Sequence, residues 1–354
     1  MKRITLADVA RRAGVHTTTV SRAMRNHPTL PEETRLRLQE LAHEMGYVPD
    51  PALAALMAYR RRGGVKPREQ SIAYITNWYT AKGWTEMPAH AQFFEGAHAK
   101  AAALGYGLEH FWLGERNLTA ARLSDILYHR GVTGLILASH RFRSDVSVDL
   151  DWRRFCAVKI DYYPLQVPIS TVSNDQLAII QLAVRKSLAA GYHRIGLVLD
   201  DVFDTAAHHA WSAGFLAEQL RIAEDDRIPI LRYVTDGGTP EPSNPIQPID
   251  GTSLAPWFRQ HRPEVIISYG RPVRPTLRDI GVRVPKDVAF VELFVESEDG
   301  SMAGVRENCF RVGEVAVEVL VSSLHQNSTG IPPIATSTLV EGTWIDGASL
   351  PPQG

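Results

Sequence analysis

The sequence predicts an α/β protein with a small all-α part at the N-terminus and a larger body of parallel sheets. The first 46 residues carry helical periodicity interrupted by glycines. From residue 70 onward, apolar strand-like runs alternate with helical segments, as in parallel sheets joined by right-handed crossovers. Charge divides the chain at a similar place. Residues 1–68 hold 13 Lys or Arg and six acidic residues, a net charge of +7, whereas the remainder carries −8.

The composition is that of an ordinary globular protein. The 354 residues are 44% hydrophobic, which allows two or three domains with full cores and excludes disorder throughout the chain. Cys156 and Cys309 are too few for a disulfide scaffold or a cysteine-built zinc site. No apolar run approaches the roughly 20 residues that span a bilayer. Amphipathic sequence follows the basic N-terminus, so we expect no signal peptide and a cytoplasmic protein.

Three short helices are predicted in the first 46 residues. The apolar positions of the first helix recur at i, i+3, i+4 and i+7 from Leu6 to Ala13, and Thr5 can cap it. Gly14 ends this helix, because a turn with positive φ favours glycine. A second helix begins near Thr17, with Val20, Ala23 and Met24 facing inward. The third helix spans about 31–45, with apolar Leu36, Leu38, Leu41 and Ala42, and ends at Gly46.

The spacing of Ala10, Gly14 and Val20 indicates a helix-turn-helix. A small residue lets the two helices cross closely, glycine makes the turn, and a branched side chain packs between the helices. The second helix then presents the polar run from His16 to Arg22, whose hydroxyls and guanidinium can reach base edges and phosphates in the major groove of DNA. The alternative is a small helical bundle with a threonine-rich face.

Residues 49–69 form a predicted hinge helix and linker. Asp50 can cap a helix, Pro51 suits its first turn, and alanines and leucines follow. A helix this short is marginal in water, so we expect it to form only when packed or bound. The alternative is a flexible linker. Gly63 and Gly64 mark the boundary to the body.

The body, residues 70–354, alternates predicted strands and helices. The expected strands are Ser71–Thr76, Leu108–Trp112, Gly134–Ala138, Phe155–Ile160, Arg194–Leu199, Val265–Ser268 and Val288–Leu293. The expected helices are Phe93–Leu104, Leu118–Arg130, Asp175–Ala190, Ala206–Leu220 and Phe310–Gln326. In open parallel sheets, ligands bind beyond the carboxyl ends of the strands, so candidate contacts follow the strands.

Several stretches of the first fifty residues resemble the DNA-binding head of the lactose-repressor family (LacI/GalR). They are Thr5–Ala10, Ala13–Val15, Thr19–Arg22, Glu33–Arg35 and Gly46–Pro49. The resemblance implies a head at residues 1–48 in which Thr17, Thr18 and Arg22 read bases. Further residues would hold phosphates or register: Leu6, His16, Thr19, Ser21, Asn26, Thr34 and Tyr47. Leu56 matches the hinge leucine that wedges between base steps in the minor groove of a dimer's operator.

The same resemblance implies that residues 70–354 form a two-lobed, periplasmic-binding-protein-like core for effector binding and dimerisation. Gly191–Ile195, Gly281–Val288 and Gly304–Arg306 agree with it. The effector would lie between the lobes. Candidate contacts are Trp78, His90, Arg141, Asp161, Asp175, Trp211, Arg271 and Asn308.

These candidates combine aromatic faces with carboxylates and amides, which suit a carbohydrate-like effector. Three departures from the family pattern argue against a typical hexose. Met87–His90 stands in place of the family's Asn-Pro-Phe-Phe, Trp211 in place of an arginine, and Gly270-Arg271 in place of Asn-Asp.

The sequence therefore predicts a homodimeric, sequence-specific DNA-binding transcription regulator, acting as a repressor, with an operator and a small effector as partners and no cofactor. An enzyme is not expected, because the chain carries no phosphate-binding Gly-rich loop with Lys-Ser/Thr, no Gly-x-Ser-x-Gly and no His-Glu-x-x-His. The alternative is a soluble solute-binding protein without a DNA role, but that protein would need an export signal, and residues 1–60 argue against it.

Overall fold

The computed structural model describes residues 4–24, 29–47, 70–140, 148–163, 167–234 and 249–353. Three predicted site residues, Asn26, Leu56 and Arg141, lie outside these ranges, as does the predicted hinge at 49–69. Within the described ranges, no helix combines the length and apolarity that crossing a bilayer needs.

The N-terminal helices are α1 (Leu6–Ala13), α2 (Thr17–Ala23) and α3 (Glu32–Glu44), as predicted. Thr5 caps α1 through a reciprocal pair of bonds: the Asp8 amide donates to Thr5 Oγ1 (3.3 Å) and the Thr5 amide donates to Asp8 Oδ2 (3.0 Å). Gly14 ends α1 with φ +69°, which confirms the predicted turn.

Six buried side chains form the core of this three-helix unit: Val9, Ala10, Val20, Ala23, Leu38 and Ala42. Of the apolar residues noted in the third predicted helix, Leu36 does not join this core, because it is 55% exposed. Leu38 and Ala42 are four residues apart and share one face of α3, whereas Leu36 precedes Leu38 by two residues and points about 200° around the helix. Met24 and Leu41 are half-buried.

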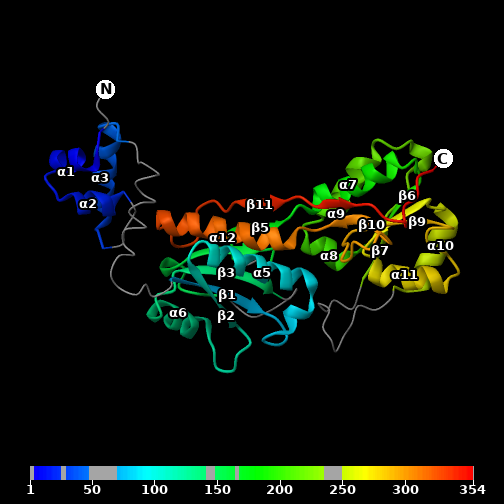
Figure 1. Cartoon of the computed structure of the whole chain (residues 1–354), viewed down its shortest axis with the longest axis horizontal. Helices are drawn as coiled ribbons and strands as arrows, with labels where there is room; N and C mark the ends of the chain where they lie inside the picture. The colour runs from blue at the N-terminus through cyan, green and yellow to red at the C-terminus, as the bar shows by residue number, and fades with distance from the viewer. Residues whose placement is uncertain are drawn as a thin grey trace.

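The described part of the body contains two six-stranded sheets, which confirms the α/β prediction (Figure 1). The first sheet has the order β11-β5-β4-β3-β1-β2 and is parallel throughout. Its strands are β1 (Gln70–Asn77), β2 (Tyr106–Trp112), β3 (Gly134–His140), β4 (Cys156–Ile160), β5 (Ser170–Asn174) and β11 (Ser337–Val340). Its helices are α5 (Pro88–Ala103), α6 (Ala120–His129) and α12 (Cys309–Gln326), with the short 3₁₀ helices η1 (Gly83–Glu86) and η2 (Trp152–Arg154).

The second sheet has the order β12-β10-β9-β8-β6-β7 and is parallel except for the β10–β12 pair. Its strands are β6 (Ile195–Asp200), β7 (Leu231–Tyr233), β8 (Val265–Ser268), β9 (Ala289–Glu292), β10 (Ala303–Arg306) and β12 (Thr343–Ile345). Its helices are α7 (Gln176–Ala189), α8 (Asp201–Ala206), α9 (Ala210–Gln219), α10 (Gly251–His261) and α11 (Gly270–Asp279), with the 3₁₀ helix η3 (Glu224–Asp226).

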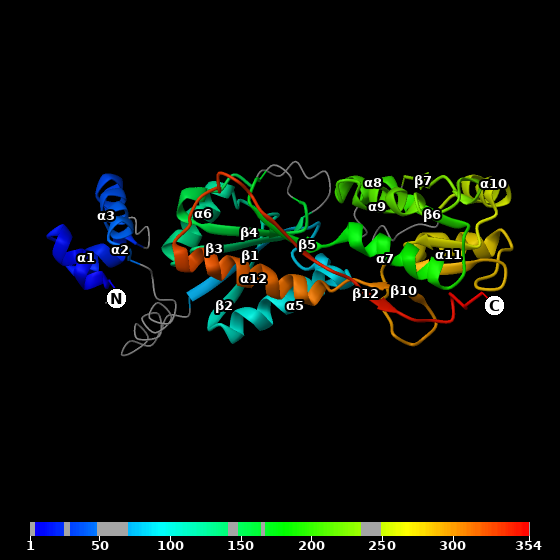
Figure 2. The same cartoon turned by 90° about the horizontal axis from the view of Figure 1, so that it is seen from above.

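The chain passes repeatedly between the two lobes built on these sheets (Figure 2). It leaves the first sheet after β5, returns after β10 into α12, and crosses again between β11 and β12. Each lobe has its own buried clusters, with α5 and α12 on one face of the first sheet and α7 and α9 on one face of the second. This arrangement brings the carboxyl ends of strands from both lobes to one region.

Two glycines allow α5 and α12 to pack closely. A Cβ at Gly313 would lie 2.1 Å from the Phe93 carbonyl oxygen, and one at Gly96 would lie 1.9 Å from the Phe310 carbonyl oxygen. Backbone therefore meets backbone at this crossing, and only glycine fits. The helix pair covers the strands of the first lobe and fixes the start of α5 beside the strand ends.

The structure corrects the predicted body in two respects. The helix expected at 206–220 is two helices, α8 and α9, because His208 and His209 adopt left-handed φ values of +53° and +60° and break it. Five strands were not predicted: β5, β7, β10, β11 and β12. They have three to five residues each and, unlike the equally short β8, hold no run of three large apolar residues, so no hydrophobic pattern stands out.

Candidate functional site

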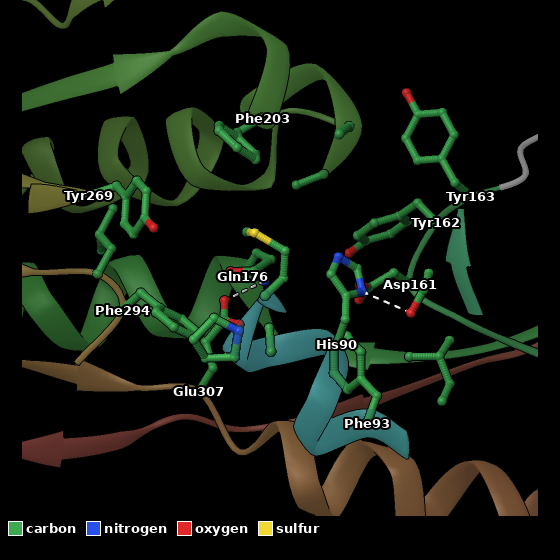
Figure 3. A pocket seen from close by; sticks show the side chains of 18 of the residues that line it. His90, Phe93, Asp161, Tyr162, Tyr163, Gln176, Phe203, Tyr269, Phe294 and Glu307 are labelled. Atoms are coloured by element: carbon green, nitrogen blue, oxygen red, sulfur yellow. Dashed lines mark hydrogen bonds between the residues drawn. The ribbon is translucent and has the colours of Figure 1, made fainter. Parts of the chain in front are cut away.

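A cavity of about 190 Å³ lies between the two lobes at the carboxyl ends of their strands. The first lobe contributes residues following β3 and β4 and the start of α5, and the second contributes residues following β6, β8 and β9 (Figure 3). We call this cavity the cleft. Its lining consists of Met87, Pro88, Ala89, His90, Phe93, Ser139, His140, Ile160, Asp161, Tyr162, Tyr163, Gln176, Phe203, Ala206, Ala207, Trp211, Tyr269, Leu293, Phe294, Glu296 and Glu307.

Backbone strain is concentrated at this lining. Ser139 at the end of β3 and Asp161 after β4 have φ values of +55° and +63°, although neither is glycine. Strained residues of this kind persist where the surrounding structure holds a side chain in place for a function. Both side chains lie in the cleft lining, and Asp161 Oδ1 accepts a hydrogen bond from Ser173 (3.0 Å).

A hydrogen-bonded chain of three residues connects the second lobe to the base of the cleft. Trp211 Nε1 donates to Gln176 Oε1 (2.6 Å), and Gln176 Nε2 donates to Glu307 Oε1 (2.8 Å). Asn174 Nδ2 donates to the other oxygen of Glu307 (3.2 Å). This network orients the Glu307 carboxyl group, and Figure 3 shows its bond from Gln176.

Burial raises the pKa of two carboxyl groups in the cleft lining, Glu307 and Asp161. It raises the pKa of Glu307 from 4.5 to about 7, partly opposed by the bond from Gln176. It raises the pKa of Asp161 from 3.8 to about 6, partly opposed by the bond from Ser173. Strongly shifted groups in a cleft are typical of functional sites.

The two histidines of the cleft are shifted in the opposite direction for the same reason. Burial lowers the pKa of both His90 and His140 from 6.5 to about 4, so both rings are neutral at pH 7. The His90 ring makes a 3.1 Å hydrogen bond with Ser139 and packs edge-on against Phe93. His140 lies at the end of β3, with Nδ1 3.1 Å from the Ala138 carbonyl oxygen.

Three of the predicted effector contacts line the cleft, and four lie outside its lining. His90, Asp161 and Trp211 line it, whereas Trp78, Asp175, Arg271 and Asn308 do not. Trp78 is buried and packs its ring against His90, with ring centroids 4.8 Å apart. Asp175 caps α7 by accepting the Ala178 amide (2.9 Å). Both residues therefore support the cleft from behind.

The other two exceptions have structural partners as well. Asn308 donates to the Glu341 carbonyl oxygen (2.6 Å), which ties the crossover into α12 to the segment before β12. Arg271 Nη2 lies 2.5 and 2.6 Å from the two oxygens of Glu296. Arg271 therefore does not line the cleft itself, but it pairs with Glu296, which does.

Sequence reasoning missed several lining residues that adjoin those it chose. Tyr162 follows Asp161, Gln176 follows Asp175, and Glu307 precedes Asn308. Tyr269 precedes Gly270-Arg271 in the same way. The position after a strand therefore predicts the region of the cleft correctly. Which of two neighbouring side chains turns toward the cleft depends on the local backbone conformation.

A second candidate surface lies on α2. Thr17, Thr18 and Arg22 are exposed, and so is His16 at the start of the helix. The His16 side chain caps α2, since its Nδ1 accepts the Thr18 amide (3.3 Å) and lies 2.9 Å from Thr18 Oγ1. An imidazole thus replaces the usual hydroxyl or carboxylate cap.

The remaining predicted residues of the head lie closer to its core. Thr19, Ser21 and Thr34 are half-buried. Leu6 and Tyr47 pack against the buried cluster of the three helices. Gln39 donates to the Ala23 carbonyl oxygen (2.8 Å) and joins α3 to the end of α2, so α2 is held as a rigid element with its hydroxyl-bearing face outward.

Comparison with known proteins identifies the type of domain that the head forms. The sequence profile described as "Bacterial regulatory proteins, lacI family" matches residues 5–50, which include all three helices of the head. Residues 5–50 therefore form a lacI-family DNA-binding domain. A curated relative, the HTH-type transcriptional repressor CytR of Escherichia coli (strain K12), is 25% identical over 194 residues, or 55% of this chain. The match spans 53% of CytR, so it covers about half the length of that relative.

Two solved structures share the fold of this chain over nearly its whole length. The lac repressor dimer bound to operator and the anti-inducer ONPF matches with a TM-score of 0.56 and 18% identity, covering 99% of this chain and 100% of that one. The complex of the transcriptional regulator CelR with cellobiose matches with a TM-score of 0.54 and 19% identity, covering 97% and 98%.

Proposed function

We propose that this protein is a homodimeric, sequence-specific DNA-binding transcription regulator that acts as a repressor in the cytoplasm. Residues 1–48 are the DNA-binding head, 49–69 a hinge helix and linker, and 70–354 an effector-binding and dimerisation core. The observation that carries the proposal is the outward face of α2, where Thr17, Thr18 and Arg22 are exposed on a helix braced by α1 and α3. Such a face can enter the major groove.

The residues of the head divide by the contacts that they would make. Thr17, Thr18 and Arg22 read base edges, and a bidentate arginine–guanine contact contributes roughly 1–3 kcal/mol of discrimination. The backbone and register contacts come from Leu6, His16, Thr19, Ser21, Asn26, Thr34 and Tyr47. Leu56 inserts between base steps in the minor groove and bends the operator.

The cleft is the effector site, in which a carbohydrate-like molecule contacts His90, Asp161 and Trp211. Aromatic rings stack on the C–H faces of a sugar, and carboxylate and amide groups bond its hydroxyls. The fold similarity to a regulator solved with cellobiose supports this assignment. Because both lobes line the cleft, an effector that prefers one lobe angle shifts the equilibrium between angles and so the spacing of the two heads.

Fluorescence anisotropy of a labelled random duplex with the full-length protein tests the DNA role. If several phosphates are neutralised, the logarithm of the affinity falls linearly with the logarithm of salt concentration, with a slope of about −0.9 for each phosphate contact. Absent or salt-independent binding would contradict the proposal. Selection of bound duplexes from a random pool then identifies the operator.

The second candidate function, a solute-binding protein without a DNA role, rests on the cleft alone. It leaves the exposed polar face of α2 and the charge of +7 on residues 1–68 without a purpose. The anisotropy measurement separates the two functions, because a solute-binding protein gives no salt-dependent signal.

A further inference from the structure

The charged residues that line the cleft indicate which charge its ligand carries. Among the described residues that line it, the charged side chains are Asp161, Glu296 and Glu307, and neither lysine nor arginine is present. Glu296 is already paired, because Arg271 lies against both of its oxygens. Two carboxyl groups, Asp161 and Glu307, are therefore left facing the cavity without an opposite charge among the described lining residues. An anionic ligand would meet repulsion here.

The histidines of the cleft do not supply the missing positive charge. His140 is 5% exposed and Nδ1 lies 3.1 Å from the Ala138 carbonyl oxygen, which can only accept. The proton is thus on Nδ1, and Nε2 is a bare acceptor. Within the described part of the chain this buried Nε2 has no hydrogen-bond partner. A ligand N–H or O–H would satisfy it, because an unpaired buried acceptor is costly.

The carboxyl groups also have acceptor capacity to spare. A carboxylate offers about four lone-pair positions. Glu307 accepts a hydrogen bond from Gln176 on one oxygen and from Asn174 and the Cys309 thiol on the other. Asp161 accepts a hydrogen bond from Ser173. The free acceptor positions of Asp161, Glu307 and His140 Nε2 would therefore be satisfied by a small ligand that carries several hydrogen-bond donors.

Aromatic rings complete a site suited to a cation. Tyr162 comes from the first lobe, and Phe203, Tyr269 and Phe294 come from the second (Figure 3). Trp211 on α9 of the second lobe also lines the cavity. An ammonium group close to an aromatic face is attracted to the negative face of the ring, and more strongly when water is excluded. At about 190 Å³, the cavity is below the range of roughly 300–1,000 Å³ that drug-sized ligands occupy, so the ligand is small.

We propose that the effector is an amine-bearing, sugar-sized cation whose ammonium group binds Asp161 and Glu307 and whose ring lies between the aromatic walls. This assignment rests on the proposed function of the cleft as effector site and specifies its ligand class. Charge decides between candidate ligands of similar shape: a protonated amine is preferred to the neutral parent sugar, and the parent sugar to the corresponding acid.

Isothermal titration of the full-length protein at pH 7 tests this order. The probes are D-glucosamine, D-glucose and D-glucuronic acid, with D-galactosamine, D-galactose and D-galacturonic acid as a second matched set. We expect the amine of at least one set to bind ten-fold or more tightly than its neutral parent, and the acid more weakly than both. Equal binding within each set, preference for a neutral or acidic member, or no binding of either amine would overturn the assignment.

Two variants connect the preference to the named carboxyl groups. Asp161→Asn and Glu307→Gln keep side-chain volume and remove the ionisable carboxyl group, so each should reduce the amine's advantage ten-fold or more. Asp287→Asn is the matched control, because Asp287 pairs with Arg283 and is not part of the cleft lining. Unchanged amine preference in both cleft variants would contradict the proposal, and circular dichroism shows whether each variant folds.

The anisotropy titration with random duplex DNA distinguishes a failure of this inference from a failure of the proposed function. If the protein binds duplex with a steep salt dependence but prefers neutral sugars, the function stands and the charge assignment is wrong. If duplex binding is absent, the regulatory function itself fails, whatever the cleft binds.

Discussion

Replacement of Glu307 by glutamine should change how stability depends on pH. The folded protein raises the pKa of Glu307 from 4.5 to about 7 because the carboxyl group is buried at the base of the cleft. A folded-state pKa above the unfolded value means that the native state binds the proton more tightly. The stabilisation by that proton is fully present below pH 4.5 and is lost as pH rises through 7.

The magnitude follows from the two pKa values. Each unit of pKa difference corresponds to 1.36 kcal/mol, so the difference between 4.5 and about 7 corresponds to about 3 kcal/mol of unfolding free energy. Glutamine carries no titrating proton. The stability of Glu307→Gln relative to the natural protein should therefore increase by about 3 kcal/mol from pH 4.5 to pH 7.5, whatever the constant offset between the two proteins.

Urea unfolding followed by tryptophan fluorescence measures this difference. All seven tryptophans belong to the body and none to residues 1–69, so the signal reports the part of the chain that contains Glu307. Asp161, His90 and His140 titrate in both proteins, and their contributions cancel in the difference apart from the coupling of Asp161 to Glu307.

Asp287→Asn is the control for this measurement. The Arg283 guanidinium lowers the pKa of Asp287 to about 2, below the tested window, so its stability difference should stay level from pH 4.5 to 7.5. A level difference for Glu307→Gln, or one that decreases with pH, would show that the carboxyl group is not desolvated as the structure indicates.

Three further perturbations test the head and the fold. Arg22→Ala should cost about 1–3 kcal/mol in discrimination between operator and altered operator while random-duplex affinity changes less; equal loss on both duplexes in anisotropy titrations would contradict base reading. Gly313→Ala places a Cβ 2.1 Å from the Phe93 carbonyl oxygen and should destabilise the body by about 1–3 kcal/mol in thermal unfolding, whereas Gly251→Ala, with 3.5 Å to its nearest neighbour, should be tolerated. Wild-type stability of Gly313→Ala would refute the backbone-to-backbone packing. Thr5→Ala removes the α1 cap and should cost about 0.5–2 kcal/mol locally, seen as faster amide hydrogen exchange over residues 6–13 of the full chain, and unchanged exchange there would count against the cap.

The sequence by itself determined the head almost completely. Its helices, the Thr5 cap, the Gly14 turn and the buried Val20 were all predicted, because the signals for each lie within about four residues of one another. The strongest strands of the body, such as Val265–Ser268, were found for the same reason, since an apolar run is a local property.

Only the tertiary structure decided the chemistry of the cleft. The sequence pointed to the correct strand ends but chose Asp175 and Asn308 where Gln176 and Glu307 line the cavity. Which neighbour turns inward depends on backbone angles at the end of a strand, such as φ +63° at Asp161. The charge state of the site depends on the fold: Asp161 and Glu307 lie far apart in the sequence, and their pKa values rise because folding reduces the contact of both carboxyl groups with water.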